Sequence, residues 1–176
     1  MTRFTALFSL LLFCTPPGSG PGDLSGVASR IADGDTFTLL TPAQKTVRIR
    51  LNGIDAPEKN QDFYRVSKSA LANMLADKTI RITVAGSDRY GRVLGEVYTP
   101  GNDSSVNLRL VARGLAWHFT RYSANAALAA AEKQARVQRL GLWRQPQPVA
   151  PWVFRKKKTQ AAPKSPSRQI AYQTSI

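Results

Sequence analysis

The stretch KTVRIRLNGI, residues 45–54, contains the clearest structural pattern in the chain. Apolar and basic side chains alternate along it, with Val47, Ile49 and Leu51 on one face and Arg48 and Arg50 on the other. A period of two residues indicates a β-strand that packs one face against a core and exposes the other to water. The stretch therefore predicts a half-buried strand with a row of guanidinium groups on its wet side.

Similar patterns on both sides of this stretch predict four more strands and three helices. The expected strands cover residues 24–31, 36–40, 79–85 and 93–98, and the expected helices cover residues 62–75, 106–112 and 124–139. In the first helix, apolar positions share one face: Val66, Ala70, Leu71 and Met74. Five short strands interrupted by one helix favour a small closed barrel of the OB type, which commonly binds oligonucleotides on one face. We therefore expect an α+β, mainly β, fold: a five-stranded OB-fold barrel with about three helices.

The two ends of the chain differ in composition from this body. Residues 1–22 combine Arg3, an apolar run over residues 4–13 and a Pro/Gly/Ser segment, which is typical of a signal peptide and linker. The apolar run is too short to span a bilayer permanently, so we expect export to the periplasm or beyond and no stable membrane span. Alternatives are a lipid anchor at Cys14 or a buried N-terminal segment. Residues 155–176 are expected to form a disordered basic tail, which leaves residues 23–154 as the folded domain.

The chain carries a formal charge of +14 over its 176 residues. Residues 23–154 hold 18 basic and 11 acidic residues, and residues 155–176 add six basic residues and no acidic one. An excess of this size favours a polyanionic partner, such as nucleic acid, anionic lipid or an acidic polymer. One interpretation is therefore a cationic surface protein that works by charge alone.

Cys14 and His118 are the only cysteine and the only histidine. An intrachain disulfide and a Cys/His zinc site are both excluded, because each needs more such residues. Any divalent ion would need oxygen ligands, which suit hard cations such as calcium or magnesium. We expect a structural role for His118, since nothing else completes a catalytic triad around it.

Three short segments carry side chains that suit phosphodiester chemistry: DGDT at residues 33–36, RLNGIDAPE at residues 50–58 and DRYGR at residues 88–92. Taken singly, each can also be an ordinary turn or helix start, because Asp, Gly and Pro favour those conformations. Taken together, two carboxylates can hold a hard cation, and two arginines can bind a phosphate and its developing charge. A further carboxylate can orient or deprotonate water. These are the parts that phosphodiester hydrolysis requires.

In this order, and followed by an Asn-x-x-Leu-Val-x-x-Gly-Leu-Ala segment at residues 107–116 and Gly-Leu-Trp at residues 141–143, the motifs resemble the staphylococcal nuclease family. The resemblance covers residues 24–145. It implies an OB-fold barrel that binds Ca²⁺ and cleaves DNA and RNA. It also implies the ligands of that ion: the carboxylates of Asp35 and Asp55 and the backbone carbonyl of Ala56. Many members have Thr where this chain has Ala56, so a hydroxyl near the expected site is lost.

The same resemblance implies catalytic roles for Arg50 and Arg92, which would bind the scissile phosphate, and for Glu58, which would act as general base or organise the water. Nucleic-acid contacts are expected from two tyrosines and three lysines: Tyr90, Tyr122, Lys156, Lys157 and Lys158. For the lysines, a merely solvated tail is the alternative.

The sequence therefore predicts a monomeric calcium-dependent nuclease, an endonuclease for which exonuclease activity and a role in maintaining or transferring a plasmid or other mobile element are further hypotheses. The alternative is a non-catalytic OB-fold module that only binds nucleic acid. Against this alternative, the five residues expected to do chemistry are all present, whereas a degenerate module would usually lack some of them.

Overall fold

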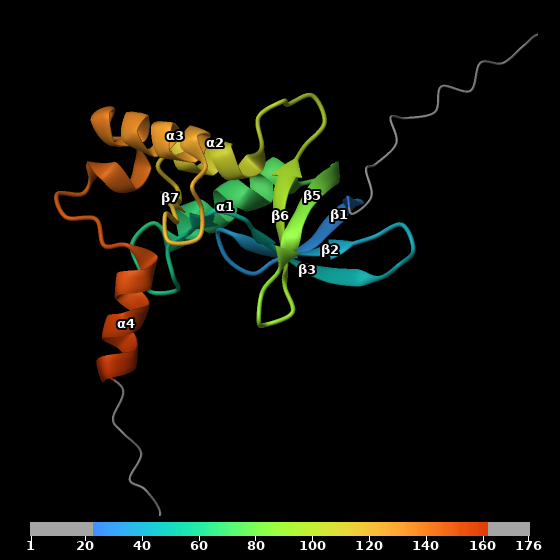
Figure 1. Cartoon of the computed structure of the whole chain (residues 1–176), viewed down its shortest axis with the longest axis horizontal. Coiled ribbons are helices and arrows are strands. Elements are labelled where there is room, and N and C mark those ends of the chain that lie inside the picture. The colour runs from blue at the N-terminus through green and yellow to red at the C-terminus, as the bar shows by residue number, and fades with distance from the viewer. Residues whose placement is uncertain (1–22, 162–176) are drawn as a thin grey trace, which may run out of the picture.

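Five strands close into a barrel in the order β1-β2-β3-β6-β5 in this computed structural model, which describes residues 23–161 (Figure 1). They are β1 (Leu24–Ile31), β2 (Thr36–Leu40), β3 (Thr46–Leu51), β5 (Thr79–Ser87) and β6 (Val93–Tyr98). β3 and β6 pair in parallel, and the other neighbours are antiparallel. The predicted five-stranded OB-type barrel is confirmed. The predicted signal peptide and the distal part of the predicted tail lie outside the described residues.

The barrel core follows from the alternation of apolar residues along the strands. In β3, Ile49 and Leu51 are fully buried while Arg48 is exposed, as the period of two predicts. Phe37 of β2 pairs with Ile49 in the antiparallel register, so their side chains share the barrel interior. Burying each such side chain stabilises the fold by about 1.5–3 kcal/mol.

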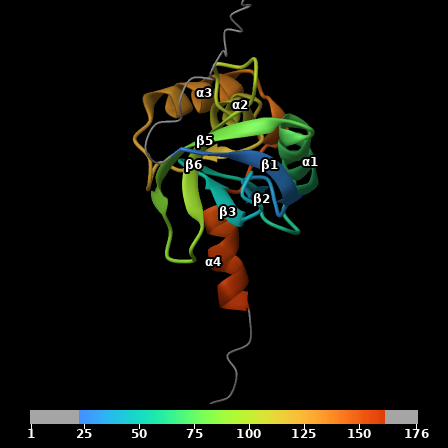
Figure 2. The same ribbon diagram turned by 90° about the vertical axis from the view of Figure 1, so that its right-hand side faces the viewer.

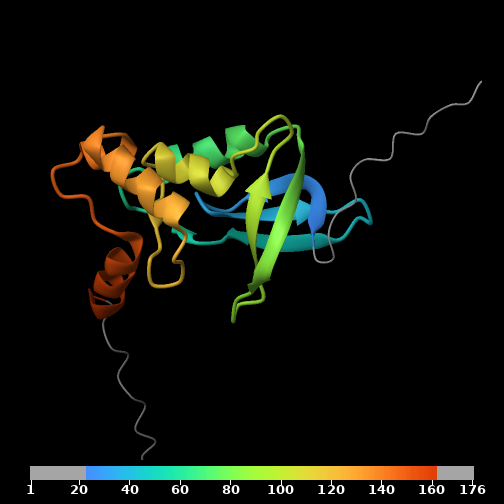
Figure 3. The same ribbon diagram turned by 45° about the horizontal axis from the view of Figure 1, so that its top comes forward.

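Three helices, α1 (Tyr64–Leu75), α2 (Val106–Ala112) and α3 (Ala126–Val137), gather at one end of the barrel (Figures 1 and 3). Ser105 and Asn125 cap the second and third helices by accepting hydrogen bonds from main-chain N–H groups of the first turn. In α1, Leu71 and Met74 are buried as expected, but Val66 is 52% exposed, so its assignment to the core face is wrong. Ser67 is buried on that helix instead.

Two short strands outside the barrel position one acidic segment. β4 (Ile54–Asp55) pairs antiparallel with β7 (Trp117–His118), so Asp55 lies opposite Trp117. His118 is buried, and its Nε2 lies 3.2 Å from the Ser123 hydroxyl, which suits the structural role predicted for it. A single 3₁₀ turn, η1 (Gly141–Arg144), follows α3.

A fourth helix, α4 (Pro151–Ala161), stands apart from the other three (Figures 1 and 2). The prediction of disorder from residue 155 onward is therefore wrong for residues 155–161. The physical reason is an aromatic anchor at the start of the helix: Trp152 stacks on Phe119 with ring centroids 5.1 Å apart and meets Trp117 edge-on at 5.6 Å. Among residues 23–161, no helix is long and apolar enough to cross a bilayer.

Candidate active site

Two carboxylates, one just before β2 and one on the short strand β4, converge on one guanidinium group of β3. Arg50 of β3 donates from Nη1 to Asp35 Oδ1 at 2.6 Å and from Nη2 to Asp55 Oδ1 at 2.8 Å. Asp35 directly precedes β2, whose Thr36 pairs with Arg50, and both carboxylates are almost completely buried. The structure thus brings together two predicted metal ligands and one predicted catalytic residue from two separate motifs of the sequence.

Gly34 allows the first motif to lie directly against the second. A Cβ at this position would come within 2.8 Å of the Cβ atoms of both Ala56 and Ser67, which is closer than side chains normally approach. The main-chain N–H of Ala56 also donates to Asp35 Oδ2 at 2.8 Å. The predicted ligand segment 55–56 is therefore fastened to Asp35 through its backbone, and Ala56 needs no side-chain hydroxyl for this contact.

The site concentrates negative charge in a poorly solvated place. Burial raises the pKa of Asp55, and the neighbouring Asp35 adds to this effect, although hydrogen bonds from arginine oppose it. Burial and the charge of Asp35 raise the pKa of Asp33 to about 7, and Asp33 Oδ1 accepts a hydrogen bond from the Asp35 N–H. Desolvation acts to lower the pKa of Arg50, but the attraction of Asp35 and Asp55 outweighs it and raises that pKa. This acidic cluster, formed by Asp33, Asp35 and Asp55 around Arg50, is therefore stabilised by positive charge placed beside it.

Arg92 lies at the edge of this cluster and joins it indirectly. Its Nε and Nη2 bind Asp88 Oδ2 at 2.8 and 2.7 Å, and its Nη1 is 3.5 Å from the Thr36 hydroxyl oxygen. Desolvation acts against ionisation of Asp88, but hydrogen bonds from Arg92 outweigh it and lower the Asp88 pKa. Thr36 in turn donates to Asp35 Oδ1 at 2.9 Å. Sequence reasoning gave no role to Thr36, although it completes the DGDT motif.

A residue that sequence reasoning placed in a disordered tail belongs to the cluster. Arg155 of α4 binds Asp55 Oδ2 through Nη2 at 2.8 Å and Glu58 Oε1 through Nη1 at 2.6 Å. Desolvation acts to lower the Arg155 pKa, but hydrogen bonds to Asp55 and Glu58 outweigh it and raise that pKa. The signal in the sequence that could have extended the fold to this residue is the Pro151-Trp152 pair, a helix start with an aromatic anchor.

The residues predicted to contact nucleic acid are exposed and dispersed. Tyr90, 65% exposed, lies in the loop between β5 and β6 with its ring centroid 5.6 Å from the Arg92 guanidinium. Tyr122, 68% exposed, lies between β7 and α3 against Phe119. The lysines of residues 156–158 are exposed on α4. Within the described contacts, only Tyr90 touches a predicted catalytic residue.

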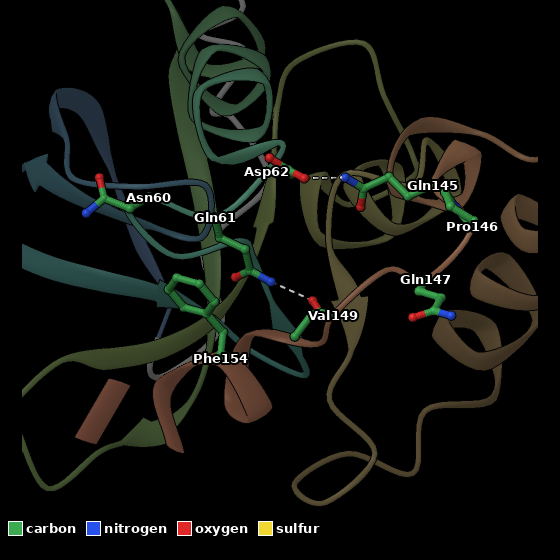
Figure 4. A pocket seen from close by; sticks show the side chains of 8 residues that line it. All are labelled: Asn60, Gln61, Asp62, Gln145, Pro146, Gln147, Val149 and Phe154. Atoms are coloured by element: carbon green, nitrogen blue, oxygen red, sulfur yellow. Dashed lines mark hydrogen bonds between the residues drawn. The ribbon is translucent and has the colours of Figure 1, made fainter. Parts of the chain in front are cut away.

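A hollow of about 440 Å³ (Figure 4) is lined by none of the carboxylates and arginines described above. Two hydrogen bonds cross between its sides, from Gln61 Nε2 to the Val149 carbonyl and from Gln145 Nε2 to Asp62 Oδ2 at 2.7 Å. The hollow therefore lies between the loop before α1 and the segment that leads to α4. It is lined by Asn60, Gln61, Asp62, Gln145, Pro146, Gln147, Val149 and Phe154.

The donor atoms of the cluster fit a hard divalent cation. Asp35 and Asp55 offer carboxylate oxygens, and the Ala56 carbonyl belongs to the segment bound to Asp35. Over residues 23–161, no three Asp, Glu, His or Cys side chains are grouped so as to hold an ion. A cation here would consequently rely on two carboxylates, a main-chain oxygen and water, a combination that calcium and magnesium both accept.

A closed OB-type barrel with buried carboxylates and guanidinium groups at one place suits a metal-dependent hydrolase of phosphodiester bonds, that is, a nuclease. The chain belongs to the family described as staphylococcal nuclease homologue, whose model matches residues 48–145. The predicted family and enzyme class are thereby confirmed, and nucleic acid is the substrate that this family membership implies.

The similarity to known proteins extends beyond the residues that the family model matches. The chain is 42% identical over 136 residues to an uncharacterized endonuclease of Escherichia coli, covering 77% of this chain and 88% of that protein. It is 39% identical over 143 residues to a micrococcal nuclease of Shigella flexneri, covering 76% and 82%. It is also 36% identical over 165 residues to Protein ParB of Escherichia coli, covering 89% and 91%.

Proposed function

We propose that this nuclease requires calcium and cleaves internal phosphodiester bonds of both DNA and RNA. The observation that supports it most strongly is the convergence of Asp35 and Asp55 on the two Nη atoms of Arg50, at 2.6 and 2.8 Å. Buried carboxylates next to a guanidinium offer a cation site beside an anion site. A phosphodiester with its counterion needs both.

In this proposal Asp35, Asp55 and the Ala56 carbonyl would hold the ion. Calcium would supply positive charge that stabilises the phosphorane-like transition state and favours deprotonation of water. Arg50 and Arg92 would donate hydrogen bonds to the non-bridging phosphate oxygens, where the additional negative charge develops. Arg92 is suited to this because Asp88 holds its Nε and Nη2, while Nη1 makes only the long 3.5 Å contact with Thr36.

Glu58 is the side chain proposed to handle the proton of the attacking water. Its side chain is 37% exposed, so water can reach it, whereas Asp35 and Asp55 are enclosed. As the water oxygen bonds to phosphorus, Glu58 would accept or orient the proton, and the bond from phosphorus to a sugar oxygen breaks. The departing oxygen takes up a proton, so the reaction consumes one water.

A cleavage assay with the full chain tests this function. Supercoiled plasmid, linear duplex, single-stranded DNA and RNA would each be incubated with calcium, magnesium or chelator, with Asp35→Asn as the inactive control. We expect calcium to convert supercoiled plasmid into nicked and linear forms, and chelator to stop the reaction. Binding of all substrates without cleavage in any ion would instead support the non-catalytic module. Mononucleotide release from linear DNA would reveal exonuclease activity.

The exposed lysines of α4 are proposed to bind the backbone of the substrate. Replacing Lys156, Lys157 and Lys158 together with Gln should weaken DNA binding and make the slope of log K against log[salt] shallower by up to about three. The reason is that each neutralised phosphate releases a counterion. The catalytic rate at saturating DNA should stay unchanged, since none of the three contacts the acidic cluster among the described ion pairs.

A variant with the same loss of charge elsewhere provides the matched comparison: Lys45, Lys68 and Lys133 to Gln, on three other elements or loops. Filter binding or fluorescence anisotropy over a range of salt concentrations measures both. Equal slopes in the two triple variants would show that the charge on α4 acts only through the net charge of the protein. The exposed rings of Tyr90 and Tyr122 support base stacking as an additional contact.

Export, a monomeric state and a role in maintaining or transferring a mobile element complete the proposal. Export is supported by Arg3 and the apolar run of residues 4–13, which have the arrangement of a signal peptide. The role with mobile elements is supported by the family resemblance alone. Fractionation of cells that express the full chain would test export directly.

A further inference from the structure

The Asp55 carboxylate accepts three hydrogen bonds from guanidinium groups within the described residues. Its Oδ1 accepts from Arg50 at 2.8 Å and from Arg155 at 3.2 Å, and its Oδ2 accepts from Arg155 at 2.8 Å. Glu58 Oε1 also accepts from Arg155, at 2.6 Å. A divalent ion that binds Asp55 therefore competes with these arginines for the carboxylate oxygens and repels their charge, which favours the withdrawal of one arginine.

The two arginines differ in how easily they can withdraw. Arg50 is 15% exposed and makes further bonds to Asp35 and to the Ile54 carbonyl, so it is held on three sides. Arg155 is 41% exposed, and its described partners are Asp55 and Glu58 alone. A long flexible side chain with its head half in water can turn into solvent or toward a bound phosphate without disturbing the barrel. Arg155 is therefore the cation that exchange would remove.

The position of Arg155 is fixed because its helix, α4, is anchored to the rest of the protein. Trp152, one turn earlier, packs against Phe119 and Trp117. Gln61 links the two sides directly, because its Oε1 accepts from the Glu58 N–H at 2.9 Å while its Nε2 donates to the Val149 carbonyl (Figure 4). The same side chain thus connects the loop that carries Glu58 with the segment that leads into α4. This arrangement aims Arg155 at the acidic pair.

We propose that Arg155 is a further residue of the active site, an internal cation that positions Asp55 and Glu58 and competes with the divalent ion for them. This inference rests on the proposed binding of an ion at Asp35 and Asp55. Helix α4 would then have two roles. Its exposed lysines would bind the nucleic-acid backbone, and Arg155 would act at the reaction centre. The affinity for the ion is then set partly by how readily Arg155 leaves.

Calorimetric titration of the full chain with calcium, without substrate, tests the competition. The variant Arg155→Gln removes the charge but keeps a side chain of similar reach, and Arg155→Lys keeps the charge but loses the two-pronged contact. We expect the calcium Kd to fall by about tenfold in Arg155→Gln, since a partly exposed charge-assisted contact no longer has to be broken. Arg155→Lys should lie between it and the parent. Lys157→Gln, with the same charge loss on the same helix, should bind calcium as the parent does.

Thermal unfolding supplies a second readout that distinguishes competition from mere packing. In chelator, Arg155→Gln should melt below the parent, because Asp55 and Glu58 lose their partner. Saturating calcium should close this gap. A gap that calcium leaves unchanged, together with equal calcium Kd values, would overturn the inference and leave Arg155 as a structural ion pair. Failure of the parent and every variant to bind calcium would overturn the proposed metal dependence itself.

Discussion

Arg50→Lys should lower the rate of DNA cleavage by about 10²–10³-fold while the protein remains folded. Two Nη atoms of Arg50 reach Asp35 and Asp55 at 2.6 and 2.8 Å, and a planar fork can present the same two donors to a phosphate. An ammonium group is a compact point charge that cannot keep this geometry. The substitution therefore preserves charge and removes only the directional donors.

Lysine is a better replacement here than alanine. Arg50 is largely enclosed, and removing its charge would leave two buried carboxylates facing each other, which costs about 3–5 kcal/mol for a buried pair. A slow Arg50→Ala protein could then simply be unfolded. The lysine variant keeps the neutralising charge, so a loss of rate reports on the donors.

The matched control for this experiment lies two residues away on the same strand. Arg48 of β3 is exposed and pairs across the sheet with Thr38, so Arg48→Lys changes the same kind of side chain without touching the cluster. Plasmid cleavage at saturating calcium measures the rate, and circular dichroism with thermal unfolding measures the fold. If Arg50→Lys and Arg48→Lys cleave equally fast, Arg50 has no part in the chemistry.

The barrel was predictable from sequence because its strands are half-buried and alternate. The limits predicted for residues 24–31, 36–40, 93–98 and 106–112 agree with β1, β2, β6 and α2 as observed. Val66 shows where periodicity misleads: by spacing it shares a helical face with Ala70, which packs against the core, but Val66 itself is exposed near the N-terminal end of α1. Strands β4 and β7 have two residues each, too few for any period to show.

The candidate site was predictable only in the part that local motifs carry. Asp35 directly precedes β2, whose Thr36 pairs with Arg50 of β3, and Asp55 follows Arg50 by five residues, so the β2–β3 pairing and local chain proximity bring the three together. Arg155 lies 100 residues after Asp55, in a segment whose lysines suggest solvation. Its placement depends on the packing of Trp152 against Phe119 and Trp117 in the folded protein. The Pro151-Trp152 pair signals a helix start with an aromatic anchor, but it does not say where that anchor binds.

Asn107→Ala should lower the stability of the protein substantially while leaving the charged side chains of the active site in place. Asn107 is 1% exposed, and its Oδ1 accepts from the Val97 N–H at 3.1 Å. Its Nδ2 donates to the carbonyls of Asn52 at 2.9 Å and Gly95 at 3.2 Å. One amide therefore ties α2 to β6 and to the turn that follows β3. Alanine would leave these groups without that partner inside the protein.

Each buried group that loses its hydrogen bond costs about 1–3 kcal/mol, and the Gly95 carbonyl still accepts from the Asn52 N–H. Two orphaned groups, the Val97 N–H and the Asn52 carbonyl, give an expected loss of about 2–6 kcal/mol in the free energy of unfolding. Urea denaturation would measure this loss as a lower midpoint with an unchanged slope. The comparison is Asn102→Ala, an exposed asparagine whose amide makes only a 3.4 Å contact with the Pro100 carbonyl.

The loss should also reach the active site, because Asn52 lies between Arg50 and Asp55. Loosening its carbonyl frees the turn that sets the separation of the guanidinium from the second carboxylate, and small displacements at a reaction centre are costly. Well below its melting temperature, Asn107→Ala should cleave plasmid more slowly than Asn102→Ala while remaining folded. Equal midpoints in urea for the two variants would mean that water takes over the bonds of Asn107, and that the turn does not depend on α2.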